Sequence, residues 1–237
     1  FSFAFLTDIH VQPEKNAAEG MKMAVDRVNE MKPDFVITGG DMIMDALRQK
    51  QSRADSLYDL YDSLSAFFEM PVYNTIGNHE VFGYHPMSGI DSTHPLYGKK
   101  MYEQRIGKRY YSFEHKGWKF YILDSVEKDP GGVYYGKVDS VQLEWLKKDL
   151  ANTDTTTPLA AVVHIPMITA QTQLLSGSTA PNRSGIVITN SKEVLNLFGS
   201  HNLKLVLQGH LHFLEEISAM GTTFITGGAV SSAWWNG

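Results

Sequence analysis

Residues 1–10, FSFAFLTDIH, decide the predicted fold class. The apolar run at their start has the length of a buried strand, and Asp8 and His10 follow it directly. Apolar residues then recur at helical spacing over residues 14–31 and again over residues 52–68, with strand-like runs between and after them. Repeated alternation of strands and helices predicts an α/β layered fold, in which parallel strands are flanked by helices.

Four further apolar runs lead, like the first, to polar residues that can bind a metal. The runs and residues are DFVIT at 34–38 before Asp41, PVYNTI at 71–76 before Asn78 and His79, LAAVV at 159–163 before His164, and LKLVL at 203–207 before His210 and His212. In α/β sheets, ligands gather in the loops beyond the carboxyl ends of the strands. If these runs are neighbouring strands, their polar residues meet at one edge of the sheet.

The remaining segments are predicted from the same patterns. Antiparallel strands are expected at 110–114 and 118–123, helices at 138–150 and 191–198, and strands at 215–218 and 222–226, with a Gly-rich loop at 130–136. Two long irregular stretches, 81–108 and 167–189, separate these elements, and loops of such length commonly carry function.

Taken singly, each polar motif has an ordinary structural interpretation. A histidine at a strand end, such as His164, serves many roles besides metal binding, and Gly-Asp after a strand is commonly a turn. An H-x-H pair also arises from alternate positions on one face of a strand. The number and order of the motifs favour a metal centre instead. The predicted metal ligands are Asp8, His10, Asp41, Asn78, His164, His210 and His212.

Together these motifs resemble the calcineurin-like metallophosphoesterase superfamily. The matching blocks are D-I-H at 8–10, G-D at 40–41, G-N-H-E at 77–80, His164, and G-H-L-H at 209–212, in the order of the family. The resemblance implies a four-layer α/β/β/α sandwich, with two sheets packed together and helices outside. It also implies two metal ions. One would be held by Asp8, His10 and His212, the other by Asn78, His164 and His210, with Asp41 bridging both.

The residue types suit hydrolysis by two metal ions. A carboxylate such as that of Asp41 has two oxygens and can span cations about 3.5–4 Å apart. Imidazoles combined with oxygen ligands point to Mn, Fe or Zn without choosing among them. Two such ions lower the pKa of a shared water, so that hydroxide bridging them serves as nucleophile near neutral pH. We therefore predict a metal-dependent phosphoesterase that acts on a phosphomonoester or a phosphodiester.

His79 follows the ligand Asn78 directly, and the resemblance implies that it faces the substrate rather than a metal. There it would steady the phosphoryl oxygens or protonate the leaving alkoxide. The alternative is a supporting role in orienting the ligands. Glu80 either holds His79 in place or is a surface acid, so the predicted catalytic residue is His79 alone.

A second motif narrows the resemblance within the superfamily. Leu123-Asp124-Ser125, followed by Q-L-x-W-L at 142–146, resembles the branch that contains class III cyclic nucleotide phosphodiesterases and purple acid phosphatases. The tyrosine that colours purple acid phosphatases belongs three residues after the Asp of G-D, where this chain has Met44. No purple iron–tyrosinate site is therefore expected, which also weakens any claim to the substrates of those enzymes.

Substrate-binding residues are expected in the two irregular stretches. Arg183 and Asn182 could bind a second phosphoryl oxygen or the edge of a base. His85 is expected at the mouth of the site, where a planar ring would stack on a nucleobase. Its neighbours there would be Tyr84, His94 and Tyr97. The alternative is a loop that packs its own aromatic side chains against one another.

Composition excludes several classes of function. The chain has no cysteine, which rules out disulfides, thiolate zinc sites and a cysteine nucleophile. Its net charge of −5 and its lack of a Lys/Arg run give no sign of a nucleic-acid or membrane surface. The sequence contains no stretch of eighteen apolar residues, so no membrane span is predicted. The predicted partner is a small phosphate ester, for which the metal ions supply positive charge.

Two functions from other classes stay open. A non-catalytic protein of the same fold would bind a partner protein through the irregular loops, and loss of ligands would identify it. A zinc-dependent amide or lactam hydrolase would favour an H-x-H-x-D-H cluster, which the sequence lacks.

The length of 237 residues fits one catalytic domain over residues 1–237. The chain opens at Phe1 with no initiator Met and closes with two large aromatic residues just before its end. These features predict a piece of a longer protein, from which a leader or a preceding segment was removed and in which more chain follows. They favour an exported bacterial protein over a cytoplasmic one.

Overall fold

The computed structural model describes residues 1–131 and 133–235. Its strands are β1 Phe3–Leu6, β2 Phe35–Thr38, β3 Val72–Asn74, β4 Tyr111–His115, β5 Trp118–Ile122, β6 Val126–Lys128, β7 Tyr134–Gly136, β8 Pro158–Val162, β9 Asn202–Gln208, β10 Glu215–Ala219 and β11 Thr222–Thr226. Its helices are α1 Ala17–Met31, α2 Gln51–Ser65, the 3₁₀ helix η1 Pro86–Ser88, α3 Lys100–Arg105, α4 Ser140–Ala151, α5 Gln171–Ser176 and α6 Ser191–Phe198. Within the described ranges, none of the helices has the length and apolar character needed to cross a lipid bilayer.

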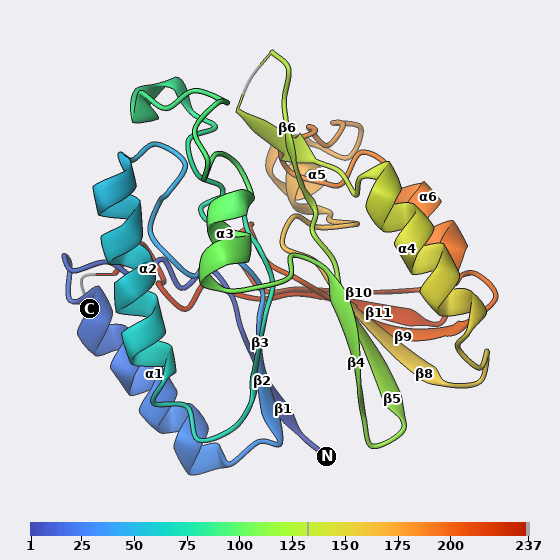
Figure 1. Ribbon diagram of the computed structural model, residues 1–237. Helices are drawn as coiled ribbons and strands as arrows, with labels where there is room; N and C mark the ends of the chain where they lie inside the picture. Colours follow the sequence, from blue (N-terminus) through green and yellow to red (C-terminus); the bar gives the residue numbers. More distant parts are fainter. Residues whose placement is uncertain (132, 236–237) are drawn as a thin grey trace.

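Two β-sheets pack face to face between two pairs of helices (Figure 1). The first sheet has the strand order β1-β2-β3, and the second has the order β10-β11-β9-β8-β5-β4. Helices α1 and α2 cover the outer face of the first sheet, and α4 and α6 cover the outer face of the second (Figure 1). The four-layer α/β/β/α sandwich implied by the sequence is therefore confirmed.

Parallel pairing dominates both sheets. All neighbours in the first sheet are parallel, as are the β5-β8, β8-β9 and β9-β11 pairs of the second. The edge strands of the second sheet pair antiparallel with their neighbours, β4 with β5 and β10 with β11. Because parallel strands point the same way, the loops after β1, β2, β3, β8 and β9 come together at one end of the sandwich.

The layer between the sheets is built from aromatic and branched apolar side chains. Phe35 and Ile37 of β2 are buried against Phe120 and Ile122 of β5. The Phe35 ring lies 5.4 Å from the Phe120 ring, edge to face. Full burial of a large apolar side chain contributes about 1.5–3 kcal/mol. This layer holds the two sheets in the relative position that the site requires.

The outer helices bury one apolar stripe each. In α1, Met21, Val25 and Val28 are buried at spacings of three and four residues, which place them on one face of a helix. In α4, Leu146 and Leu150 are buried with the same spacing. The helical period predicted from the sequence therefore matches the packing.

The irregular stretches differ in part from the sequence prediction. The Gly-rich loop expected at 130–136 includes β7, which pairs antiparallel with β6 to form a separate hairpin. Short helices η1 and α3 lie within 81–108, and α5 lies within 167–189. Residue 132 of the predicted loop and residues 236–237 at the end of the chain lie outside the described residues.

Candidate metal centre

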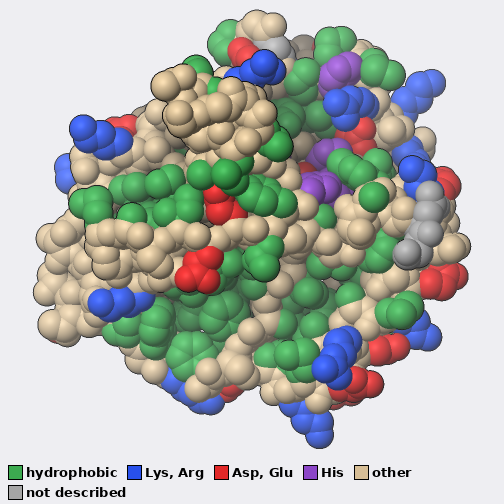
Figure 2. All heavy atoms as spheres, turned by 180° about the vertical axis from the view of Figure 1, so that it is seen from behind, with side chains coloured by type: hydrophobic (Ala, Val, Ile, Leu, Met, Phe, Trp, Pro, Cys, Tyr) green, Lys and Arg blue, Asp and Glu red, His purple; other side chains and the backbone are tan. Residues whose placement is uncertain are grey.

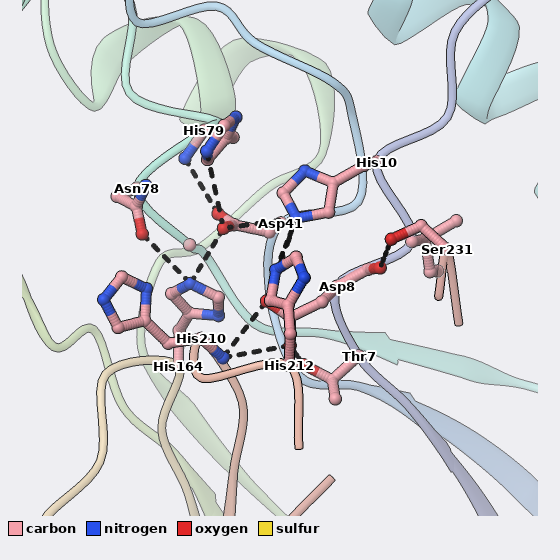
Figure 3. A network of polar contacts seen from close by, with 12 residues as sticks. Thr7, Asp8, His10, Asp41, Asn78, His79, His164, His210, His212 and Ser231 are labelled. Carbon is pink, nitrogen blue, oxygen red and sulfur yellow. Dashed lines mark hydrogen bonds and ion pairs between the residues drawn. The ribbon is translucent and has the colours of Figure 1, made fainter. Parts of the chain in front are cut away.

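The seven predicted ligands and His79 lie together at the carboxyl end of the strands (Figure 3). They come from five loops: Asp8 and His10 after β1, Asp41 after β2, Asn78 and His79 after β3, His164 after β8, and His210 and His212 after β9. Figure 3 shows their polar atoms pointing toward one another. Residues more than 200 positions apart in the chain thereby share one site.

Asp8, His10 and His212 form a first group of possible ligands. The Nε2 atom of His212 lies 3.2 Å from Oδ1 of Asp8 and 3.1 Å from Nε2 of His10. Thr7 donates a hydrogen bond of 2.7 Å from its Oγ1 to Oδ2 of Asp8. The Asp8 carboxylate is thus oriented with Oδ1 toward the two imidazoles.

Asp41, His164 and His210 form a second group, and Asn78 adjoins it. The Nε2 atom of His164 lies 3.1 Å from Oδ2 of Asp41 and 3.1 Å from Oδ1 of Asn78. The rings of His164 and His210 are 5.1 Å apart, edge to face. If Asn78 is added to this group and Asp41 is shared, the two groups have the members that the family resemblance implies. His10, Asp41 and His79 form a further group of possible ligands.

Asp41 is the residue that faces both groups. Its Oδ1 atom accepts a hydrogen bond of 2.8 Å from the backbone N–H of His79. Its Oδ2 atom lies 3.1 Å from Nε2 of His164 and 3.8 Å from Nε2 of His10. The sequence suggested that two carboxylate oxygens would span the ions. In the structure, Oδ2 is the oxygen turned toward both groups.

Backbone carbonyls define which ring nitrogen of two histidines faces the site. His164 Nδ1 lies 2.8 Å from the carbonyl oxygen of Gly39, and His210 Nε2 lies 2.8 Å from that of Gly185. A carbonyl oxygen only accepts, so each of these nitrogens carries the hydrogen. The opposite nitrogen of each ring is therefore the one that can bind a metal ion, which is the arrangement typical of metal-binding histidines.

Burial and charge set the protonation of these groups. Burial lowers the pKa of His10 to about 3 and that of His210 to about 4. Burial opposes protonation of His164 as well, but the neighbouring Asp41 carboxylate outweighs it and raises the pKa of His164 to about 9. Burial likewise opposes ionisation of Asp41, yet the nearby imidazoles hold its pKa well below the usual range. A cation at the second group would therefore take the place of a proton.

The donor set fits transition-metal ions. In the first group, two imidazole nitrogens approach to 3.1 Å beside a carboxylate, a contact that leaves one lone pair facing another unless a proton or cation lies between. Imidazole nitrogens mixed with carboxylate and amide oxygens suit Mn, Fe and Zn. The chemistry of its donor atoms therefore fits the cluster for holding metal.

Much of the metal centre has strained backbone. The candidate ligands in the left-handed region are Asp8 (φ 54°), His10 (φ 48°), Asp41 (φ 52°), His210 (φ 72°) and His212 (φ 57°). Each such non-glycine residue costs on the order of 1–3 kcal/mol and persists only where its surroundings hold it. The loops must therefore be stabilised by contacts from outside the ligand set.

Glu80 supplies four hydrogen bonds to the backbone of these loops. Its interpretation as a surface acid is wrong. The side chain is fully buried. Oε2 accepts from the N–H groups of Gly77 and Asp41, and Oε1 accepts from those of Met42 and Ile43, at 2.7–3.1 Å. Burial and the charge of Asp41 raise the pKa of Glu80 above its usual range, and the N–H groups of Ile43 and Gly77 oppose this shift because they stabilise the carboxylate. The carboxylate ties the G-D and G-N-H loops together.

We expect Glu80→Gln to lower the free energy of unfolding of the metal-free protein by roughly 2–6 kcal/mol. One amide NH₂ would replace a carboxylate oxygen that accepts two backbone N–H groups, and each buried unpaired donor costs about 1–3 kcal/mol. Urea denaturation followed by circular dichroism measures the change. Replacement of the exposed Glu144 of α4, Glu144→Gln, is the matched control and should change stability little. Equal stability of the two variants would contradict the role given to Glu80.

Two motif glycines allow the loops to approach this closely. A Cβ atom at Gly77 would lie 2.3 Å from the backbone nitrogen of Asp41, and one at Gly209 would lie 2.1 Å from Oγ1 of Thr7. The Gly209 contact would displace the hydroxyl that orients Asp8. Glycine in G-N-H and G-H-x-H is therefore required by packing.

The ring of His79 is turned into the site by a backbone contact. Its Nδ1 atom lies against the carbonyl oxygen of Met44, which places the hydrogen on Nδ1 and leaves Nε2 3.9 Å from Oδ2 of Asp41. Side chains of His79 and His212 are 11% and 21% exposed, whereas those of Asp8 and His10 are fully buried. The centre therefore opens to solvent on the side of His79 and His212. Figure 2 shows histidine side chains reaching the surface between hydrophobic ones.

The three predicted substrate-binding residues lie in loops and have different surroundings. His85 accepts a hydrogen bond from the N–H of Met87 and caps η1. Asn182 donates to the carbonyl oxygen of Thr169, so both residues have structural contacts. Arg183 is exposed and lies two residues before Gly185, whose carbonyl contacts His210. Substrate contact by these three residues stays a prediction.

The aromatic residues of the first irregular stretch pack largely against one another. The Tyr84 and Tyr97 rings lie 5.4 Å apart, and so do those of Phe82 and His94. Tyr84 is also buried. The described contacts therefore favour the alternative in which this loop packs its own aromatic side chains.

Several supporting residues were not singled out as such by the sequence. Ser125 Oγ accepts a hydrogen bond of 2.8 Å from the N–H of Ile165, next to His164. Gln142 joins β5 to α4 by pairing with both backbone groups of Asp124. The L-D-S and Q-L-x-W-L motifs already marked this region in the sequence. Ser125 of the first motif and Gln142 of the second hold the loop after β5 and helix α4 beside the site.

Comparisons with known proteins identify a matching family and structures of similar fold. A family model described as calcineurin-like phosphoesterase matches residues 1–214. The chain is similar to a dimetal phosphatase from Danio rerio, with a TM-score of 0.72 and 16% identity over 98% of this chain and 88% of that one. It is similar to a purple acid phosphatase from yellow lupin (Lupinus luteus), with a TM-score of 0.62 and 15% identity over 94% of this chain and 43% of that one.

A third structure of the same fold is described as an anchor rather than as a phosphatase. GAP50 of Plasmodium, described as the anchor in the inner membrane complex, has a TM-score of 0.59 and 15% identity over 98% of this chain and 72% of that one. Identities this low show a shared fold alone. A search of curated proteins gave no match.

Proposed function

The chain belongs to the calcineurin-like phosphoesterase family, a class of metal-dependent hydrolases, and from that premise we propose that it hydrolyses a phosphate ester at a centre of two metal ions. The observation that carries the proposal is the position of Asp41 between two groups of ligands. A non-catalytic relative would be expected to have lost ligands, whereas all seven lie together here.

Each group of side chains would hold one ion. Asp8, His10 and His212 would bind the first, and Asn78, His164 and His210 the second, with Asp41 between them. When bound there, Mn, Fe or Zn ions would supply positive charge for the phosphoryl oxygens and would lower the pKa of a water, so that hydroxide is available near neutral pH. No nucleophile from the protein is required for this chemistry.

His79 acts on the substrate side of the centre. The Met44 carbonyl holds Nδ1 and so directs Nε2 to the partly exposed side of the site. From there Nε2–H of the protonated ring can donate to a phosphoryl oxygen or to the oxygen of the leaving alcohol. The backbone N–H of His79 is bonded to Asp41, which keeps this ring in register with the ligands.

The alcohol part of the ester is proposed to bind beside α5. A pocket of about 540 Å³ there is lined by apolar Leu175, Pro181 and Ile186 together with Arg183. The adjoining carbonyl of Gly185 contacts His210, so this pocket belongs to a loop that reaches the metal centre. The exposed Arg183 guanidinium would bind a phosphoryl oxygen of the ester.

We expect protein reconstituted with Mn²⁺ to hydrolyse a chromogenic aryl phosphate ester, and metal-free protein to be inactive. Release of nitrophenolate from a monoester and from a diester, followed by absorbance, measures the activity and separates the two ester classes. An Asp8→Ala, Asp41→Ala double variant controls for contaminating phosphatases. Protein that binds two ions of Mn, Fe or Zn yet cleaves neither ester would overturn the proposal.

A further inference from the structure

A turn at the carboxyl end of the described chain crosses the D-x-H loop. The backbone N–H of Val230 donates to the carbonyl oxygen of Thr7 at 3.0 Å. Ser231 donates to the carbonyl oxygen of Asp8 from both its backbone N–H, at 3.2 Å, and its Oγ, at 2.8 Å. Figure 3 shows Ser231 directly beside Asp8. Residues 229–235, here named the closing turn, are thereby anchored to the backbone of the first ligand loop.

Trp235 anchors the same loop from its other end. Its indole N–H lies 2.8 Å from the carbonyl oxygen of Ile9 and 3.2 Å from that of His10. Its ring packs on α1 at Gly20, where a Cβ atom would lie 2.1 Å from Cζ3 of the indole. Glycine is unfavourable inside a helix, so the close approach of Trp235 accounts for the residue at this position.

Trp234 lies against the histidines of the metal centre. Its ring centroid is 3.9 Å from that of His10 and 4.9 Å from that of His212, with interplanar angles of 40° and 38°. It is 5.5 Å from the ring of His79. The indole therefore covers both imidazoles of the first ligand group at once.

His10 depends on this contact more than His164 and His210 do. The rings of His164 and His210 are each oriented by a backbone carbonyl on the nitrogen that faces away from the site. Nδ1 of His10 is buried and has no hydrogen-bond partner in the part of the chain that the structure describes. Its ring is instead packed by Trp234 on one side and by the edge of His79, at 4.6 Å, on another.

The closing turn has the backbone of a constrained segment. Ser232 (φ 49°), Trp234 (φ 70°) and Trp235 (φ 68°) all adopt left-handed conformations that side-chain-bearing residues rarely take. Such conformations cluster at functional sites and persist where surrounding contacts hold them. Here the contacts that hold them are those to the first ligand loop.

We propose that Trp234 is a positioning residue of the metal centre, which fixes the imidazoles of His10 and His212 for the ion of the first group. It takes the part that a hydrogen-bonded carbonyl plays for His164 and His210. The family match ends at residue 214, so Trp234 lies outside the matched motifs. The proposal rests on the proposed function, because it takes Asp8, His10 and His212 to be metal ligands.

The test compares three variants at one position: Trp234→Ala, Trp234→Leu and Trp234→Phe. Each metal-free protein is titrated with Co²⁺ and followed by visible absorption, and bound metal after dialysis is measured by elemental analysis. Trp234→Ala is expected to bind one ion with wild-type affinity and the other roughly 10–100-fold more weakly, the range typical of lost supporting contacts. Trp234→Phe, which keeps an aromatic ring on His10, is expected to restore most of the affinity.

Controls separate this inference from general loss of structure. Trp145→Ala removes an indole that packs on Tyr110 away from the ligands and is expected to bind both ions normally. If Trp234→Ala does not fold by circular dichroism, Trp234→Leu keeps apolar volume without the ring and is expected to show the same selective loss. If a folded Ala or Leu variant binds both ions with wild-type affinity, or binds both equally more weakly, the role of Trp234 is wrong while the proposed function stands. Wild-type protein that binds no metal overturns the proposed function itself.

Discussion

Replacing Asp41 by asparagine is expected to lower the occupancy of both metal ions together. Oδ2 of Asp41 is 3.1 Å from Nε2 of His164 in one group and 3.8 Å from Nε2 of His10 in the other. The substitution keeps the shape of the side chain but removes its negative charge. Because Asp41 faces both groups, each ion should bind more weakly by more than the roughly 10–100-fold that changes outside the ligand set cost.

Elemental analysis after dialysis against a fixed metal concentration measures this effect. Asp8→Asn is the matched control, since Asp8 belongs to the first group alone and its replacement should release one ion. Phosphate-ester hydrolysis should fall in both variants. If Asp41→Asn loses a single ion and keeps the other at wild-type affinity, Asp41 does not bridge the two groups.

Replacing His79 by alanine is expected to reduce kcat by roughly 10²–10⁴-fold, the range for a lost general acid or base, while both ions stay bound. The two proposed ligand groups do not include His79. Its Nδ1 atom is bonded to the carbonyl oxygen of Met44, and its Nε2 atom faces the open side of the site. The backbone N–H that donates to Asp41 survives the substitution. Steady-state kinetics and metal content are measured on the same preparation.

The leaving group distinguishes the two roles considered for His79. If Nε2–H protonates the departing alkoxide, the loss should be much larger for an alkyl ester than for a nitrophenyl ester, whose leaving group needs no proton. If it steadies the phosphoryl oxygens, both esters should lose activity equally. His201→Ala is the control, because the ring of His201 contacts the carbonyl oxygen of Leu150 and none of the candidate ligands. Loss of metal in parallel with activity would show that His79 instead supports the ligands.

Much of the fold could be predicted because its signals are local. Helix α6 begins and ends at the predicted residues, Ser191 and Phe198, and its apolar spacing lies within eight residues of sequence. The parallel strands were visible as short apolar runs bounded by turn residues. The β6–β7 hairpin was not visible, because its two strands have three residues each and are too short to show a period.

Residues that support the site were harder to predict, because their role depends on distant contacts. Glu80 has the same local pattern as a surface acid, and only folding brings the N–H groups of Asp41, Met42 and Ile43 around its carboxylate. Trp234 and Trp235 stood out as aromatic residues without a visible place to pack. Folding places them against His10 and Gly20, more than 200 residues earlier in the chain.

By itself, the sequence determined the kind of chemistry: which residue types follow which strands, in which order, and hence that carboxylates and imidazoles meet at one edge of a sheet. These are properties of short segments, and parallel strands carry them to a common place. The tertiary structure decided how the residues are used. It turned Oδ2 of Asp41 toward both groups and placed a backbone carbonyl against the rings of two candidate ligands, His164 and His210. The ring of His10 is packed by Trp234 instead. Those choices depend on distances between loops that are remote in sequence, and only the packing of the sheets and the closing turn sets these distances.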